Sequence, residues 1–318
     1  MKFLVTGANG FIGRALCAEL ALRGQTVRAA LRSANAPLKD VETVVVGSID
    51  GNTDWTVALN GVDTVIHLAA RVHVMKETAV DPLSEFSKVN FYGTSNLAQQ
   101  AVRAGITRFV YTSSIKVNGE RTMGSSLFSE SDNPDPQDPY AVSKWQAEQN
   151  LQRIARETGL QVVIVRPPLV YGSGVKGNFV SFLAAIDRGI PLPLSGARNL
   201  RSLIYAGNLV DALIACATHP AAAGQTYLVS DGDDIATARL AEEIAGALGR
   251  KSRVFYFPPL LVRAAAVLSG RAKQFDRLFS SLRVEDEKIR RELAWFPPYT
   301  LEQGLQATIR WYRNKACI

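Results

Sequence analysis

Cysteine and histidine are scarce in this chain of 318 residues, which contains three of each. The cysteines, Cys17, Cys216 and Cys317, show no Cys-x-x-Cys spacing, so neither a metal site nor a disulfide framework is expected. We therefore predict that the protein holds no metal, and a reducing compartment, the cytoplasm, is the expected location.

Long apolar runs and long basic stripes are also missing. The longest apolar stretch, residues 254–268, contains two prolines and Arg263 and is too short to span a bilayer. We expect it to form a partly buried helix of a small second domain, without stable membrane insertion. The N-terminus reads as a strand and a turn, not as a signal peptide. The net charge of +7 is scattered, so nucleic acid is not an expected partner, whereas anionic small molecules would suit it.

A glycine-rich turn follows the first predicted strand, residues 2–6. Gly7, Gly10 and Gly13 form a G-x-x-G-x-x-G motif, and a helix with apolar residues on one face begins directly after it. Such a turn brings a dinucleotide pyrophosphate close to the backbone and to the helix N-terminus. The alternative is a simple strand-to-helix turn without a ligand.

The end of the second predicted strand, residues 26–32, indicates which dinucleotide would bind. An NAD site usually carries an acidic residue there. This chain has Arg32 and Ser33 instead, and the next carboxylate is Asp40. A guanidinium can bind a ribose 2′-phosphate, so NADP(H) is favoured and NAD(H) remains possible. Alternatively, the arginine stacks on adenine or is only solvated.

Strands and helices alternate through the first half of the chain. Further strands are predicted at residues 44–46, 64–67, 108–112 and 161–166, and one long helix at 81–104. This alternation predicts an α/β fold with a doubly wound parallel (Rossmann) sheet. We expect His67 to be a satisfied strand-end histidine and Asn90 to anchor a neighbouring loop. We assign residues 1–167 and 203–230 to the dinucleotide domain, and 168–202 and 231–318 to a smaller, mostly helical substrate domain.

Tyr140 and Lys144 lie four residues apart at the start of a predicted helix and so share one face. A neighbouring cation favours the phenolate, so we expect a lowered tyrosine pKa suited to proton transfer. The alternative is a half-buried ring beside a solvated lysine. Ser114, after the strand 108–112, is placed to hydrogen-bond a substrate oxygen.

Several motifs occur in one order along nearly the whole chain: the glycine turn, His67-Leu-Ala-Ala70, Asn90, Ser113-Ser114, Tyr140-x-x-x-Lys144, Arg166-Pro-Pro168 and Val170-Tyr-Gly172. This order resembles the extended short-chain dehydrogenase/reductases, in the NAD-dependent epimerase/dehydratase family. The resemblance implies that Tyr140 is the acid/base, that Lys144 lowers its pKa and holds the nicotinamide ribose, and that Ser114 is the catalytic serine. It also implies a homodimer packed through two helices per subunit.

The motifs and the resemblance together predict two sets of binding residues. The cofactor set is Gly7, Asn9, Gly10, Phe11, Ile12, Gly13, Arg32, Ser33, Ser48, Ile49, Leu68, Ala69, Ala70, Asn90, Thr112, Ser113, Tyr140, Lys144 and Pro167. The substrate set is His73, Ser114, Lys116, Asn178 and Arg201, with Asn178 and Arg201 at positions that bind the nucleotide and its diphosphate.

Two departures from the family pattern narrow the expected activity. Related 4,6-dehydratases carry Asp-Glu after the catalytic residue, whereas this chain has Ile115-Lys116, so water elimination is not expected. Leu169 replaces an asparagine that is frequent in the family, which leaves the sugar undefined. The segments 67–75 and 113–120 are similar to bacterial UDP-sugar 4-ketoreductases, often labelled UDP-glucose 4-epimerases.

We therefore expect NADP(H)-dependent reduction of a 4-keto nucleotide sugar of the UDP-4-keto-6-deoxy-N-acetylhexosamine class, in surface polysaccharide biosynthesis. An NAD-dependent UDP-sugar 4-epimerase is the first alternative. A non-catalytic dinucleotide sensor on the same fold is the second.

Overall fold

The protein is organised around a seven-stranded sheet in the order β3-β2-β1-β4-β5-β6-β9, with every neighbouring pair parallel. The computed structural model describes all residues except 35–37, 39–40, 73–79, 269–271 and 317–318. The strands are β1 (Lys2–Thr6), β2 (Thr26–Leu31), β3 (Glu42–Val45), β4 (Thr64–His67), β5 (Arg108–Thr112), β6 (Gln161–Arg166) and β9 (Thr226–Leu228). The predicted Rossmann-like fold is confirmed.

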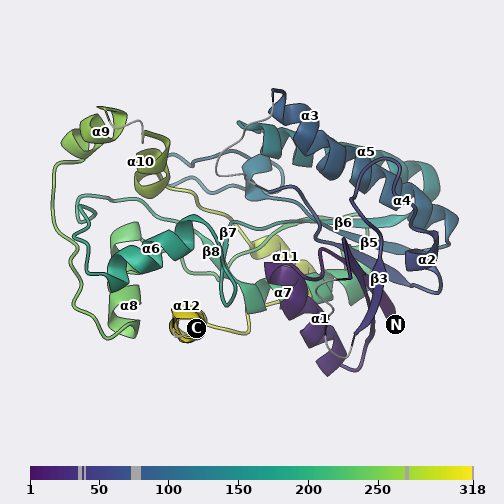
Figure 1. Cartoon of the computed structure of the whole chain (residues 1–318). Helices are drawn as coiled ribbons and strands as arrows, with labels where there is room; N and C mark the ends of the chain where they lie inside the picture. Colours follow the sequence, from purple (N-terminus) through teal and green to yellow (C-terminus); the bar gives the residue numbers. More distant parts are fainter. Residues whose placement is uncertain (35–37, 39–40, 73–79, 269–271, 317–318) are drawn as a thin grey trace.

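Helices cover both faces of this sheet (Figure 1). The helices are α1 (Phe11–Leu22), α2 (Thr56–Leu59), α3 (Pro82–Ser87), η1 (Lys88–Gly93), α4 (Thr94–Arg103), η2 (Ile115–Val117), α5 (Pro139–Thr158), α6 (Asn178–Asp187), α7 (Ala206–Thr218), η3 (Pro220–Ala222), α8 (Thr237–Ala247), α9 (Pro259–Leu268), α10 (Ala272–Phe279), α11 (Glu287–Leu293) and α12 (Leu301–Ala316). Helices α2, α4 and α5 lie on one face, and α1, α7 and α11 on the other (Figure 1).

The central strand β1 supplies both cores because successive side chains of a strand point to opposite faces. Phe3 and Val5 are fully buried in the core that includes α1 and α7, whereas Leu4 is buried in the core that includes α4 and α5. Ile289 of α11 and the following Trp295 also pack into the first core, although they come from the end of the chain.

A second, smaller unit holds the elements α6, α8 and α12, with their own apolar cluster around Phe179, Leu183, Ile244 and Leu305. Two short strands, β7 (Leu169–Tyr171) and β8 (Leu203–Tyr205), pair in parallel as a separate two-stranded sheet. Neither strand is predicted from the sequence. The limits assigned to the two domains remain a prediction.

The helix predicted at residues 81–104 is wrong as a single regular element. The segment is α-helical at both ends, but η1 between them is a π-helix with Asn90 in its middle. A π-helical turn inserts an extra residue and changes the direction of the side chains that follow, and such turns frequently occur at functional sites.

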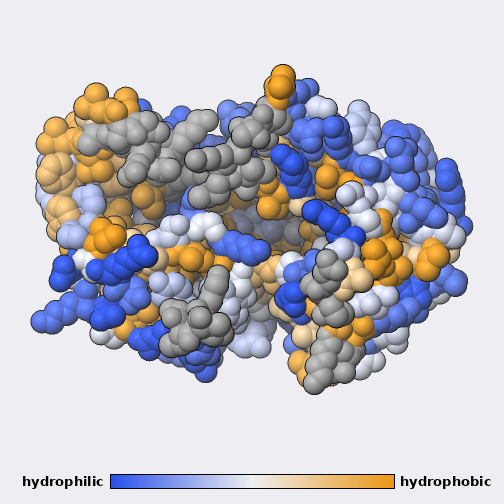
Figure 2. Space-filling model, in the orientation of Figure 1, coloured by the Kyte–Doolittle hydropathy of each residue, from blue (hydrophilic) through white to orange (hydrophobic). Residues whose placement is uncertain are grey.

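The stretch 254–268 is more exposed than expected. Helix α9 leaves Leu260, Leu261 and Leu268 exposed, with Leu268 at 90% of its full accessibility. Figure 2 shows apolar residues gathered at the surface over this helix. Among the described residues, no helix is both long and apolar enough to cross a bilayer.

Candidate functional site

The glycine turn between β1 and α1 is a close-packed cradle. Gly7 has φ +65°, and a Cβ there would lie 2.9 Å from the backbone nitrogen of Ala69. A Cβ on Gly13 would lie 2.2 Å from the carbonyl oxygen of Gly7, so only glycine allows the helix to approach the turn. These contacts place the turn directly against the Leu68–Ala70 segment after β4.

The N-terminus of α1 is open to an anion. Gly10 caps the helix without a side-chain hydrogen bond, and no acidic residue lies in the first turn. The first N–H groups of a helix lack intrahelical partners and carry the positive end of the helix dipole. Asn9, Phe11 and Ile12, the remaining predicted residues of this turn, lie in or beside it. The cradle therefore fits the pyrophosphate of a dinucleotide.

Two further groups at the carboxyl end of β5 fit a bound cofactor. The hydroxyls of Thr112 and Ser113 are buried and have no hydrogen-bond partner among the described residues. Buried polar groups in native proteins are rarely left unsatisfied, so a missing ligand is a physical explanation for both. Both residues belong to the predicted cofactor set.

His67 is held in the uncharged form at the end of β4. Its Nδ1 lies 2.6 Å from the Thr6 hydroxyl and its Nε2 lies 2.9 Å from the Thr94 hydroxyl. Burial, with a smaller contribution from the charge of Lys144, lowers the pKa of His67 to about 3. The Thr6 hydroxyl also accepts a hydrogen bond from the backbone N–H of Ala69 at 3.1 Å. The prediction of a satisfied strand-end histidine is confirmed.

Tyr140 lies in the first turn of α5, facing the end of β5. The helix begins at Pro139 because Asp138 caps it: the Asp138 Oδ1 accepts a hydrogen bond from the backbone N–H of Ala141 at 2.7 Å. The phenol ring packs edge-on against Phe86 of α3, with centroids 6.0 Å apart. This packing directs the phenol toward Ser114, the residue that directly precedes η2.

The expected lowering of the Tyr140 pKa is wrong for the described structure. Burial, and secondarily the negative charge of Asp138, raise this pKa to about 12, while hydrogen bonding from Ser114 acts in the opposite direction. Lys144 does not offset the burial because its ammonium points elsewhere. Its Nζ donates to the carbonyl oxygen of Thr112 at 2.7 Å and lies 4.4 Å from the ring centre of Tyr111.

Asn90 anchors the segment after β4 to helix α5, as predicted. Its Oδ1 accepts a hydrogen bond from the backbone N–H of Arg71 at 2.8 Å, and its Nδ2 donates to the Arg71 carbonyl oxygen at 3.0 Å. The same Nδ2 donates to the Ser143 hydroxyl at 2.9 Å. The π-helical turn η1 thus presents one buried amide to both a site-lining loop and the helix of Tyr140.

A buried ion pair connects helix α5 to strand β6 near the candidate site. Arg166, the last residue of β6, donates to Glu148 of α5 with Nη2 2.5 Å from Oε2, and the two side chains are 4% and 0% exposed. The Nη1 of Arg166 also donates to Asn118 Oδ1 at 2.9 Å. This network joins α5, the helix that carries Tyr140, to β6 and to the loop after β5.

The other predicted site residues are spread more widely. Arg32 and Ser33 are exposed after β2, Ser48 and Ile49 follow β3, and Pro167 follows β6 with its carbonyl oxygen accepting from the Ile115 N–H. Asn178 is exposed at the start of α6, and His73 lies outside the described residues. Arg201 donates from Nη1 to the carbonyl oxygen of Ser280 at 3.1 Å. Lys116 is engaged in ion pairs with Asp138 and Glu120.

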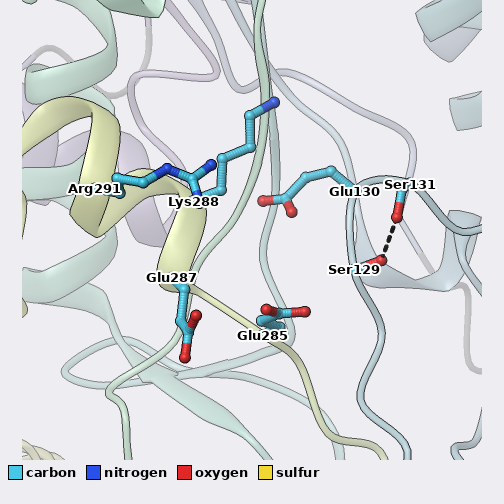
Figure 3. A pocket seen from close by; sticks show the side chains of 7 residues that line it. All are labelled: Ser129, Glu130, Ser131, Glu285, Glu287, Lys288 and Arg291. Atoms are coloured by element: carbon cyan, nitrogen blue, oxygen red, sulfur yellow. Dashed lines mark hydrogen bonds between the residues drawn. The ribbon is translucent and has the colours of Figure 1, made fainter.

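A pocket of about 380 Å³ lies between residues 129–131 and the charged side chains of 285–291 (Figure 3). Glu130 is part of its lining, and burial raises the pKa of this carboxyl group. Its Oε1 accepts a hydrogen bond from the backbone N–H of Leu228 at 2.8 Å. No predicted catalytic or binding residue within the described ranges lines this pocket.

Sequence reasoning missed two polar residues of the site. Asp138 is not among the residues predicted from the sequence, although an aspartate directly before Pro139 is a typical start of a helix. Arg71 was included only in a segment similarity, because its role depends on the loop that Asn90 holds.

Comparisons with known proteins agree with this geometry. Residues 3–230 match the family model described as the NAD dependent epimerase/dehydratase family. A Vibrio cholerae relative named UDP-glucose 4-epimerase is 40% identical over 309 residues, which cover 96% of this chain and 94% of the relative.

Two solved structures cover nearly the whole chain. MoeE5 in complex with UDP-glucuronic acid and NAD has a TM-score of 0.79 at 26% identity and covers 99% of this chain and 100% of its own. UDP-glucose 4-epimerase of Thermotoga maritima with UDP-glucose has a TM-score of 0.80 at 22% identity and covers 99% and 100%. The latter likeness shows the fold alone.

Proposed function

Because the chain belongs to the NAD dependent epimerase/dehydratase family, we propose that it is a UDP-sugar 4-epimerase that retains NAD. The family makes the chain an NAD-dependent enzyme that modifies nucleotide sugars. The observation that carries the proposal is the 40% identity to a UDP-glucose 4-epimerase over 96% of the chain. It supports the epimerase, our first alternative from the sequence, better than the 4-ketoreductase that the sequence favoured.

In the proposed reaction the cofactor carries the hydride, and the side chains handle the proton and the developing charge. A bound NAD supplies the reversible acceptor of hydride at the sugar C4 carbon. Tyr140 in its phenolate form would accept the proton of the C4 hydroxyl, and would return it when the ketone has turned over in the site and is reduced on its opposite face. Ser114 hydrogen-bonds the same oxygen and stabilises the charge that develops there.

Lys144 has a physical role in this scheme even though it does not contact the phenol. Burial lowers its pKa to about 7. A lysine with this pKa can change its protonation state near neutral pH, which a solvated lysine cannot. Its ammonium lies at the Thr112 carbonyl, beside the two unsatisfied hydroxyls, so it is placed to bind the ribose of the cofactor.

We infer that a UDP-sugar binds between this site and the smaller unit. MoeE5, at 26% identity, is described in complex with UDP-glucuronic acid and NAD, which supports the same pair of ligands here. Asn178 and Arg201 are proposed to bind the uridine diphosphate portion. The homodimer implied by the family resemblance is likewise a proposal, which light scattering on the purified protein tests.

The cofactor state of the purified protein tests the epimerase proposal. An epimerase gains by never releasing NAD, because it uses the same cofactor for both half-reactions. We expect about one non-dialysable NAD per chain, and interconversion of UDP-glucose and UDP-galactose, or of their N-acetyl counterparts, without added cofactor. Protein that arrives without NAD and consumes NADPH on a 4-keto UDP-sugar would overturn the epimerase in favour of a reductase.

The 4-ketoreductase with NADP(H) remains the second candidate because of one observation. Arg32 and Ser33 are exposed at the end of β2, and no carboxylate lies between them and Asp40. Titration of NADPH and NADH into apoprotein separates the candidates. If the guanidinium binds a 2′-phosphate, Arg32→Ala weakens NADPH roughly tenfold to a hundredfold and leaves NADH unchanged. The exposed Arg239 on α8 provides the control variant, Arg239→Ala.

A non-catalytic sensor is the remaining alternative from the sequence. The presence of Ser114, Tyr140 and Lys144 at one site weighs against it. Turnover of any UDP-sugar that disappears in Tyr140→Phe would exclude it.

A further inference from the structure

Lys116 connects the two proposed catalytic groups through separate parts of the same residue. Its backbone N–H donates to the Ser114 hydroxyl oxygen at 3.3 Å. Its side-chain Nζ lies 2.5 Å from Oδ2 of Asp138 and 3.0 Å from Oε1 of Glu120. Lys116 and Asp138 are only about a quarter exposed, at 26% and 24%, so solvent screens this pair incompletely.

Asp138 in turn holds the start of the helix that carries Tyr140. While Oδ2 binds the ammonium of Lys116, Oδ1 accepts from the Ala141 N–H at 2.7 Å. The phenol is two residues away in sequence, so the carboxylate is among the nearest charges to the proton that Tyr140 must exchange. A salt bridge to Lys116 cancels much of that negative charge.

We propose that Lys116 is a positioning residue for the acid/base pair: it neutralises the capping carboxylate of Asp138 and aligns the Ser114 hydroxyl with the Tyr140 phenol. The inference rests on the proposed roles of Ser114 and Tyr140. It differs from the substrate-binding role that the family resemblance implied for Lys116. The ammonium already has two carboxylate partners, so it is committed to the protein and not to a ligand.

The surroundings of the phenol determine the sign of the expected effect. The titratable and charged groups around the phenol and its contact residues, in the described part of the chain, include Asp138 before α5, Lys144 on α5, Lys116 and Glu120 after β5, Tyr111 on β5, and Arg71, whose guanidinium lies 5.4 Å from the Phe86 ring centre. The Asp138 charge raises the pKa of Tyr140. Removing Lys116 leaves that charge uncompensated and raises the pKa further, whereas removing the charge of Asp138 lowers it.

The test is a double-mutant cycle read as pH profiles of kcat, since one pKa unit corresponds to a tenfold change in rate at fixed pH. The limb of interest is the rise of kcat with pH as Tyr140 ionises. Lys116→Met should move this limb to higher pH and lower kcat near neutrality about tenfold. Asp138→Asn keeps a capping side chain and should move the limb to lower pH. The double variant should return it close to the wild-type position, and Lys116→Arg should preserve it. Glu157→Gln, in the exposed pair with Arg153 on the same helix, is the control and should leave the limb unmoved.

A second readout does not depend on the substrate. Phenolate absorbance near 295 nm at about pH 11, minus that of the same variant carrying Tyr140→Phe, reports ionisation of this phenol in the free protein. Asp138→Asn should increase the signal and Lys116→Met should decrease it. Opposite shifts that cancel in the double variant support the inference, even if the proposed sugar chemistry fails. Variants that lose activity without moving either the limb or the phenolate signal would overturn it and leave Lys116 a purely structural residue. If Lys116→Met does not fold, Lys116→Gln replaces it in the cycle.

Discussion

Lys144 donates a hydrogen bond from its Nζ to the carbonyl oxygen of Thr112 at 2.7 Å, and this contact joins α5 to the carboxyl end of β5. The side chain is 2% exposed, which makes it one of the largest fully enclosed side chains near the site. Burial lowers its pKa to about 7, and the charge of Glu148 opposes this change. Burial of this ammonium therefore lowers the stability of the fold, although the proposed contact with the cofactor ribose requires the lysine at this position.

Replacing this lysine should stabilise the fold in a pH-dependent way. An unfolded lysine titrates near ~10.4, so between about pH 7 and 10 the unfolded chain holds a proton that the folded chain has released. The destabilisation is complete below pH 7 and fades as the pH rises toward 10. Lys144→Met should therefore raise Tm clearly at about pH 6 and much less at about pH 9.5. An equal gain at both pH values in thermal unfolding would contradict the lowered pKa.

Tyr140→Phe should remove the proton-transfer group while preserving the ring that packs against Phe86. General acid/base catalysis contributes ~10²–10⁴-fold, so kcat should fall within or beyond that range. NAD binding, measured by calorimetry, should stay within about twofold. Tyr92→Phe, at an exposed tyrosine of η1, is the matched control. A Tyr140→Phe enzyme with nearly normal turnover would refute the assignment of this residue.

The ion pair between Glu148 and Arg166 should be costly to break. Glu148→Gln leaves the Arg166 guanidinium buried beside a neutral partner, a change that typically lowers the free energy of unfolding by ~3–5 kcal/mol. The matched control is Glu157→Gln, also on α5, whose pair with Arg153 is half exposed at 51% and 55%. Exposed pairs contribute ~0–1 kcal/mol. Equal effects in urea unfolding would show that the buried network does not support the site.

Gly13→Ala should damage the cofactor cradle. The new Cβ would lie 2.2 Å from the carbonyl oxygen of Gly7, so α1 must move away from the turn. We expect at least tenfold weaker NAD binding together with a lower Tm. In contrast, Gly246→Ala on α8 meets no atom within 4 Å and should be neutral or stabilising by up to about 1 kcal/mol. Normal NAD affinity in Gly13→Ala would indicate that the dinucleotide binds elsewhere.

Much of the large sheet could be predicted from the sequence because its signals are local. Strands such as 108–112 and 161–166 are short apolar segments bounded by turn residues, and the glycine turn has a fixed spacing. The strands β7 and β8 could not be predicted in this way. Each has three residues, and each exists because it pairs with the other across an intervening segment of the chain.

The sequence predicted which residues form the site better than it predicted their pKa values. The spacing of Tyr140 and Lys144 correctly placed both on one helix, but their pKa values depend on burial and on where the ammonium points. Neither the burial of these side chains nor the direction of the ammonium can be read from a spacing of four residues. The helix 81–104 likewise has a regular apolar pattern, whereas its π-helical turn places the Asn90 amide within hydrogen-bond distance of both Arg71 and Ser143, which are remote in sequence.

The position of β9 affects the order in which this protein can fold on the ribosome. The sheet that holds the dinucleotide turn receives its last strand only at residues 226–228, and Trp295 completes one of its two cores. A nascent chain of 200 residues therefore displays the finished glycine motif on a half-covered sheet. Such a chain exposes apolar surface until nearly the whole protein has been synthesised. Messages truncated before residue 295 should yield insoluble chains and not a free nucleotide-binding fragment.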